Sequence, residues 1–164
     1  MREELSHSEV EAALDGAISG RVCVQAWLGV AHVLFLGFGE DVLPPTPPGG
    51  HHPVPMYELQ IDMADWWVES QTGVLGASTD DRPKAEAAAV SLVGRRATRW
   101  QFIEPFPALE ISFEPGLRVK MAPYTDSDTS HKEAWVLRIP VYYIFVQWDG
   151  TAGIGRRDDY FIDP

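Results

Sequence analysis

One order of hydrophobic and polar positions occurs twice along the chain. A helix-like segment at 6–18 is followed by Gly20-Arg21 and two alternating runs of apolar residues. A second helix-like segment at about 83–93 is followed by Gly94-Arg95 and two further alternating runs. Periods of 3.6 and 2 residues are typical of helices and strands. The pattern therefore predicts that one helix-plus-strands unit is present as an internal duplication.

The first predicted helix, from Ser6 to Ile18, carries both a start and a stop signal. Ser6 and Glu9 have the spacing of a capping box, in which each side chain bonds a backbone amide left unpaired at the helix start. Gly20 follows, and glycine commonly ends helices because it adopts left-handed φ without steric cost. The stripe predicted to pack on a sheet consists of Val10, Ala13, Leu14, Ala17 and Ile18.

The remaining apolar runs predict strands. They lie at 21–28, 32–38, 57–63, 66–69, 73–77, 96–103, 109–113, 117–121, 135–139 and 142–148. The expected fold is therefore α+β, with a mainly antiparallel sheet and two helices in a single domain, 1–164. The predicted repeats are 6–78 and 80–148, with a C-terminal tail at 149–164. Within them, Trp67-Val68 is aligned with Trp135-Val136.

A proline-rich segment at 39–55 interrupts the first repeat. Proline lacks a backbone donor and fixes φ, which favours an irregular loop. The segment contains His51 and His52, and His131 lies in a later polar loop. Imidazole is a common zinc ligand, but adjacent histidines rarely bind one ion and no third ligand is fixed nearby. The pattern favours exposed loop histidines and predicts no metal site.

The other candidate chemistry is also weak. Cys23 and His32 meet across a predicted hairpin, yet nothing orients them as nucleophile and base, so a packed, inert cysteine is expected. Glu58 and Asp62 alternate with apolar residues, which predicts the solvated face of a strand. The glycines of DGTAGIG, residues 149–155, do not have the spacing of a phosphate-binding loop. No catalytic residue and no cofactor site is predicted.

The charge balance narrows the classes of partner. The chain has 13 basic and 24 acidic residues, for a net charge of −11 at pH 7. Such a chain repels nucleic-acid phosphates and anionic membranes, so neither is an expected partner. A basic protein suits it better, although acidity also simply favours solubility. The single cysteine and the lack of a signal-peptide-like apolar core at the N-terminus predict a cytoplasmic location.

The two repeats differ on their predicted outer faces. Polar residues occupy this face in the second repeat, namely Arg99, Gln101, Glu110 and Ser112. In the first repeat, Trp27, Val33 and Phe35 form an apolar patch there, which predicts an interface. A homodimer or a foreign protein would cover this patch from outside. The proline-rich loop or the Tyr160-Phe161 tail would cover it from within.

The second half carries a family resemblance. The stretches that carry it are Gly94-Arg95, Leu109–Phe113, Gly116–Val119 and Ala134–Val136. This order of elements resembles small bacterial proteins of unknown function, several families of which are similar to immunity proteins encoded beside polymorphic toxins. The resemblance implies a non-catalytic protein-binding module and transfers no functional residue. The alternative from the residues is a small-molecule-binding or hydrolytic enzyme that uses a cleft between the repeats.

Overall fold

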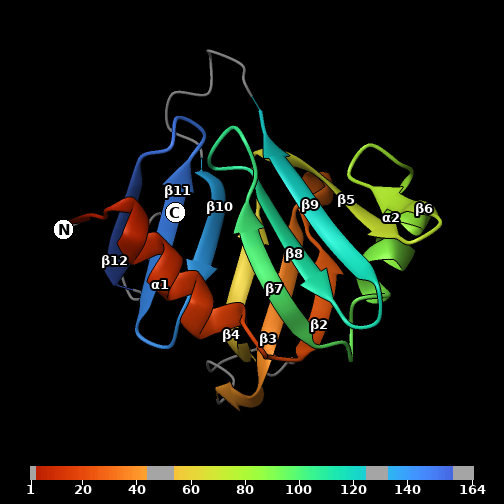
Figure 1. Cartoon of the computed structure of the whole chain (residues 1–164), viewed down its shortest axis with the longest axis horizontal. Coiled ribbons are helices and arrows are strands. Elements are labelled where there is room, and N and C mark those ends of the chain that lie inside the picture. Colours follow the sequence, from red (N-terminus) through yellow and green to blue (C-terminus); the bar gives the residue numbers. More distant parts are fainter. Residues whose placement is uncertain (1–2, 44–53, 125–132, 157–164) are drawn as a thin grey trace.

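The computed structural model of the chain describes residues 3–43, 54–124 and 133–156, which form two antiparallel sheets and two helices (Figure 1). The seven-stranded sheet has the order β1 (Glu3–Glu4), β12 (Ala152–Arg156), β11 (Tyr142–Gln147), β10 (Glu133–Arg138), β4 (Val54–Ile61), β3 (Leu34–Leu43) and β2 (Cys23–Leu28). The five-stranded sheet has the order β6 (Gly73–Ala77), β5 (Ala64–Ser70), β9 (Leu117–Pro123), β8 (Leu109–Phe113) and β7 (Ala97–Phe102). The predicted α+β class with a mainly antiparallel sheet is confirmed.

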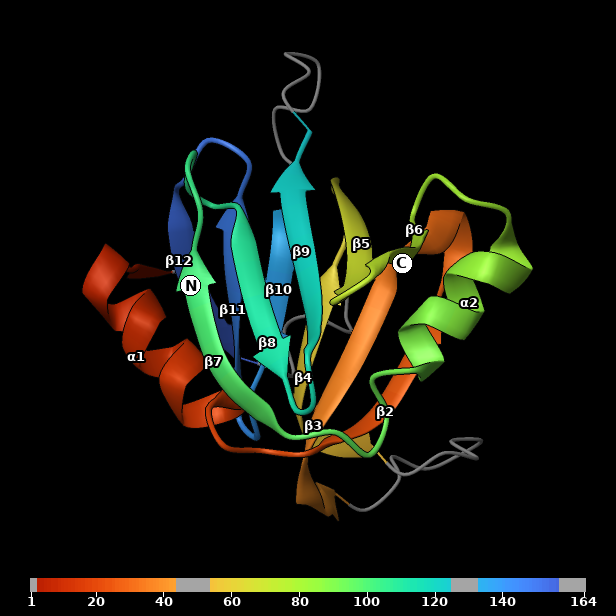
Figure 2. The ribbon, with the colours of Figure 1, turned by 45° about the vertical axis from the view of Figure 1, so that its right-hand side comes forward.

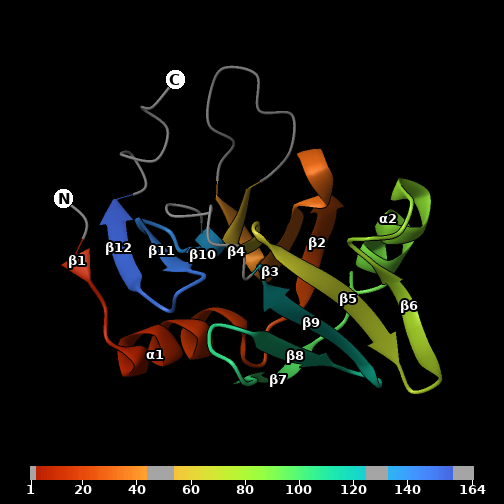
Figure 3. The same ribbon diagram turned by 90° about the horizontal axis from the view of Figure 1, so that it is seen from above.

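The two sheets form two layers with a helix at each side (Figures 2 and 3). Helix α1 (His7–Ile18) packs against β7 and β3, and helix α2 (Arg82–Val90) packs against β6 and β2. The core lies between the layers, where Phe38 of one sheet stacks on Phe113 of the other with ring centroids 6.2 Å apart. Each helix thus closes one side of the space between the sheets.

The capping box predicted for α1 is present. The backbone N–H of Ser6 donates to Oε2 of Glu9 at 2.8 Å, and the N–H of Glu9 donates to Oγ of Ser6 at 3.3 Å. The predicted stripe faces the core, with Ala13 only partly buried. Helix α2 ends earlier than predicted. The alanines of α2 allow this helix to pack closely on β6. Gly76 of β6 lies so near Ala88 that a β-carbon at position 76 would be only 2.7 Å from the β-carbon of Ala88.

The strand pairing relates the two halves of the chain in an approximately two-fold way. β4 pairs with β10 and β5 pairs with β9, so each of these strands pairs with one from the other half of the chain. Backbone hydrogen bonds also link the two sheets at the starts of β2 and β7. The N–H of Gly20 donates to the carbonyl of Ala97 in β7, and the N–H of Gly94 donates to the carbonyl of Cys23 in β2. Both glycines have left-handed φ, 74° and 83°. A duplicated unit would give this arrangement, and the duplication itself stays a prediction.

Two buried tryptophans occupy matching positions. The indole N–H of Trp66 donates to the carbonyl of His32, in the β2–β3 connection, at 2.8 Å. The indole N–H of Trp135 donates to the carbonyl of Pro107, in the β7–β8 connection, at 3.1 Å. Trp66, and not Trp67, is therefore the structural counterpart of Trp135. The predicted alignment was wrong by one residue at this point.

Two further predictions are corrected by the strand geometry. Strict alternation along residues 21–28 predicts Cys23 on the same face as Gln25, but a register shift between them turns Cys23 into the core. β7 has a corresponding shift between Ala97 and Arg99. The segment predicted as a tail at 149–164 includes strand β12, which pairs with β11 and β1.

Candidate binding face on the seven-stranded sheet

The outer face of the seven-stranded sheet carries two rows of side chains that cross its strands. Strand register places these residues opposite one another. One row consists of Trp27, Phe35, Gln60, Val136, Phe145 and Gly153. The other consists of Gln25, Gly37, Glu58, Arg138, Tyr143 and Gly155. We call these two rows the outer face.

Trp27 and Phe35 form a parallel stack at one end of the outer face. Their ring centroids are 3.9 Å apart and their planes differ by 3°. Trp27 is 43% exposed, whereas Phe35 is partly buried. Gly29 permits this arrangement, because a β-carbon there would lie 2.8 Å from the Phe35 ring. The stack therefore presents a large, firmly supported indole to its surroundings.

A buried ion pair lies beside the stack. The Arg138 guanidinium donates to the Glu58 carboxylate and also to Oε1 of Gln60 at 2.8 Å. The side chains of Arg138 and Glu58 are only 18% and 9% exposed. Cζ of Arg138 lies 5.9 Å from the centre of the Phe35 ring, within the range of a cation–π contact. The outer face thus joins aromatic rings to a charged network.

The far end of the outer face is apolar. Val136, Tyr143 and Phe145 form a buried cluster separate from the main core. Any side chain at Gly153 or Gly155 would collide with the ring of Phe145 or Tyr143, respectively. The glycines of the DGTAGIG segment therefore provide space for two aromatic rings, which is a structural reason for their presence.

The structure brings together two of the three predicted interface residues. Trp27 and Phe35 form the stack, whereas Val33 lies at the end of a 3-10 turn (Val30–His32) and is partly buried. The patch is less uniformly apolar than expected, since Gln60 and the ion pair adjoin it. The segments proposed to cover it from within fall mainly on residues 44–53 and 157–164, outside the described residues. Its role as an interface stays a prediction.

The turn beside this patch has strained backbone. Ala31 and His32 adopt left-handed φ of 55° and 60°, which is unfavourable for residues other than glycine. The Trp66 indole bonds the His32 carbonyl, and Nδ1 of His32 lies 2.9 Å from the Ser78 carbonyl oxygen. These contacts hold the turn in a conformation that leaves the Val30 side chain 88% exposed.

The proposed pairing of Cys23 with His32 does not form. Burial raises the pKa of the Cys23 thiol to about 12, and its Sγ instead lies 3.4 Å from the carbonyl oxygen of Gln25. The ring of His32 bonds the Ser78 carbonyl as described above. A thiol with so high a pKa is a poor nucleophile, as expected for a packed cysteine.

The remaining histidine and carboxylate candidates have different outcomes. His51, His52 and His131 lie outside the described residues. Glu58 was predicted to lie on a solvated face, but it is buried because Arg138 pairs with it. Sequence reasoning missed this pair, and neither residue has a local signal that points to the other. Within residues 3–43, 54–124 and 133–156, no group of three His, Cys, Asp or Glu side chains lies close enough to hold a metal ion.

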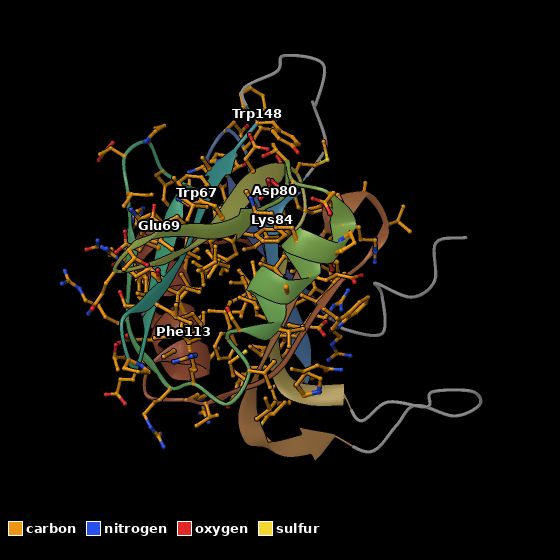
Figure 4. The ribbon with its side chains drawn as sticks, turned by 90° about the vertical axis from the view of Figure 1, so that its right-hand side faces the viewer. Trp67, Glu69, Asp80, Lys84, Phe113 and Trp148 are labelled. Atoms are coloured by element: carbon orange, nitrogen blue, oxygen red, sulfur yellow. The ribbon has the colours of Figure 1, made fainter. Side chains whose placement is uncertain are left out.

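The five-stranded sheet has the polar outer face predicted for the second repeat. Lys120 lies between Glu69 at 3.2 Å and Glu110 at 3.7 Å, and the Trp67 indole donates to Glu69 at 2.8 Å (Figure 4). Burial raises the pKa of Glu69, but the hydrogen bonds from Trp67 and Lys120 outweigh this effect, so that the pKa lies below its ordinary value. Such cross-strand contacts between oppositely charged side chains are typical of a sheet face in water.

An open hollow of about 560 Å³ with mixed polar and apolar lining lies at one end of this sheet. It is lined by Gln71, Thr98, Ser112, Phe113, Glu114, Gly116, Leu117 and Arg118. A smaller hollow of about 310 Å³ adjoins it and is lined by Ser70, Gln71, Thr72, Arg95, Pro115, Gly116 and Leu117. The lining of the larger hollow contains one carboxylate and no histidine, an arrangement without the paired groups of acid–base hydrolysis.

Comparisons with known proteins do not assign the chain. It matches no protein-family model, no curated protein and no solved structure. Among the described residues, no helix is long and apolar enough to cross a membrane. Function is therefore argued from the geometry of the outer face.

Proposed function

We propose that the chain is a non-catalytic, cytoplasmic bacterial protein that binds a basic protein partner, in the manner of an immunity protein. The observation that carries this proposal is the exposed Trp27 indole supported flat by Phe35. Tryptophan is enriched among residues that dominate binding energy, because it buries a large area with few rotatable bonds. An indole already fixed by stacking loses little conformational entropy on binding.

The charge of the chain supports a basic partner. With a net charge of −11, the long-range field of the protein attracts positive surfaces and raises association rates at low salt. Part of this charge is concentrated at the N-terminal end. The segment from Glu3 to Asp15 exposes five carboxylates and contains no lysine or arginine. Carboxylates would steer the partner, and Trp27 would anchor it.

The experiment places a photo-crosslinking amino acid at position 27 and, as a control, at position 142. Tyr142 is exposed to a similar extent, 40% against 43%, but lies on β11. We expect one protein from the source cells to crosslink at position 27 and not at position 142. That protein is then purified, and its Kd is measured for the wild type, Trp27→Ala and Tyr142→Ala. We expect Trp27→Ala to weaken binding about 30-fold, equivalent to about 2 kcal/mol.

Two results would contradict the proposal. One is equal crosslinking at both positions, and the other is equal affinity of the purified partner for the wild type and Trp27→Ala. Light scattering distinguishes the homodimer alternative. A dimer mass for the wild type and a monomer mass for Phe35→Asp would assign the patch to a second copy of the chain. An unchanged mass and unchanged stability of Phe35→Asp would exclude both a second copy of the chain and a segment of the same chain as the cover of this patch.

A further inference from the structure

The hollow at the end of the five-stranded sheet gathers several hydrogen-bonding side chains and is separate from the outer face of the other sheet. Its volume of about 560 Å³ is open to solvent and can receive part of a small molecule. Hydrogen-bonding side chains come from three places: Gln71 from the β5–β6 turn, Thr98 and Ser112 from β7 and β8, and Glu114 from the β8–β9 turn. Phe113, labelled in Figure 4, adjoins these side chains but is only 2% exposed.

Arginines surround this hollow although the chain as a whole is acidic. Arg118 lines it, and Arg95 lines the adjoining hollow. Arg99 flanks the same end, since it pairs with Ser112 in the sheet, whereas the Arg96 guanidinium donates to the Gly20 carbonyl. Arg118, Arg95 and Arg99 thus outnumber the carboxylates of Glu114 and Glu69 here, in contrast to the net charge of −11. Such a reversal concentrates anions at this end of the molecule.

The two lining guanidinium groups have donors available. Nε of Arg95 donates to the Ser91 carbonyl at 2.8 Å, and within the described part of the chain its terminal nitrogens make no hydrogen bond. Arg118 is exposed and interacts electrostatically with Glu69, again with no hydrogen bond among the described residues. The planar guanidinium fork fits a carboxylate with two parallel hydrogen bonds.

We propose that the hollow binds a hydroxylated carboxylate, that is, a sugar acid. The carboxylate would pair with Arg118, and the hydroxyl groups would bond to Gln71, Thr98, Ser112 and Glu114. Glu114 decides between classes of anion. Its carboxylate accepts hydrogen bonds from hydroxyl groups, whereas it repels the additional charge of a phosphate. This inference does not depend on the proposed protein-binding role.

The test is an NMR titration of the ¹⁵N-labelled full chain with glucuronate, and with glucose, acetate and inorganic phosphate as comparison ligands. We expect saturable shifts at the lining residues with glucuronate by about 20 mM, as for a Kd near 1 mM. Glucose lacks the carboxylate, and acetate lacks the hydroxyl groups, so each should bind at least about tenfold more weakly. Phosphate should also bind at least about tenfold more weakly, because of Glu114.

Two variants assign the effect to the hollow. Arg118→Gln should weaken glucuronate binding at least about tenfold, since it removes a charge-assisted pair. Arg99→Gln is the matched control, because Arg99 is exposed on the neighbouring strand and donates to Gln101 instead of lining the hollow. Because Arg99 adds only to the general positive field and does not line the hollow, this variant should weaken glucuronate binding by no more than about twofold. The amide spectrum of each variant reports whether the fold is retained.

Several outcomes would overturn the proposal. No saturable shift at the lining residues would show that the hollow is not a site for this class. Equal binding of glucose would indicate a neutral sugar, and equal binding of phosphate or acetate would indicate an unselective anion. An equal loss in Arg118→Gln and Arg99→Gln would show that only the general charge of this surface matters.

Discussion

The Arg138–Glu58 ion pair gives the sharpest test of the outer face. The perturbation is a double-mutant cycle with Glu58→Gln, Arg138→Met and the double variant. Two charges at 4 Å attract by about 4 kcal/mol at an effective dielectric of 20, and desolvation offsets part of this. Because the side chains are only 9% and 18% exposed, we expect each single variant to lose about 2–4 kcal/mol of unfolding free energy. The remaining partner would then be a buried charge without its counter-ion.

The double variant should lose no more than either single variant, since it leaves no unpaired charge. The coupling energy is therefore expected to be at least about 2 kcal/mol, measured by urea unfolding at neutral pH. The matched control is the surface pair Asp80–Lys84, at 3.4 Å with 28% and 55% exposure (Figure 4). Its coupling in an Asp80→Asn, Lys84→Met cycle should stay below about 0.5 kcal/mol. A coupling equally small for Arg138 and Glu58 would refute the reasoning, because it would mean that water screens their pair.

Three further predictions concern single sites. The Cys23 thiol should not react with a thiol reagent at pH 8 in the native state and should react fully in urea. In the native state a pKa of about 12 leaves only about one thiol in ten thousand as thiolate at that pH. Rapid labelling of the native protein would contradict this prediction. Trp66→Phe and Trp135→Phe should each lower the unfolding free energy by about 1–3 kcal/mol in urea titrations, since each leaves a carbonyl without its indole donor; losses below about 0.5 kcal/mol would contradict it. The Trp100 indole donates a hydrogen bond to Asp15 and lowers the pKa of its carboxyl group. The stabilisation from this hydrogen bond is therefore present above the ordinary carboxyl pKa and is lost as the pH falls through the lowered pKa. The deficit of Trp100→Phe in urea unfolding should therefore shrink from pH 7 to about pH 2, and a deficit independent of pH would count against this.

Local sequence signals were sufficient where neighbouring residues decide the structure. The Ser6–Glu9 capping box acts within one helical turn, so its spacing alone predicts it. Gly20 was identified as a stop signal, and it adopts left-handed φ just beyond the end of α1. The alternating runs located the strands, because side-chain direction in a strand has a period of two residues.

The side of a strand on which a residue lies was predicted less well. A bulge reverses the alternation that follows it, and this moved Cys23 into the core. The alignment of Trp67 with Trp135 failed for a related reason. Adjacent tryptophans give the same sequence signal, and only the carbonyl of His32 shows that Trp66 is the buried one.

The candidate sites depend on contacts between residues distant in sequence. Trp27 and Phe35 were predicted together because one hairpin joins them. Arg138 and Glu58 are 80 positions apart, and they meet only because β10 pairs with β4. The hollow likewise needs the β5–β6 turn beside the β8–β9 turn, and no pattern within either turn predicts that arrangement.

The sequence by itself determined most elements of this protein: the two helices, most of the strands, the α+β class and the aromatic hairpin. These follow from backbone geometry and hydrophobic periodicity, which act over a few residues. Only the tertiary structure decided which charges pair, which tryptophan is buried and where arginines collect around a hollow. Strand order and register set those distances, and they result from the packing of the whole chain, not from any one segment.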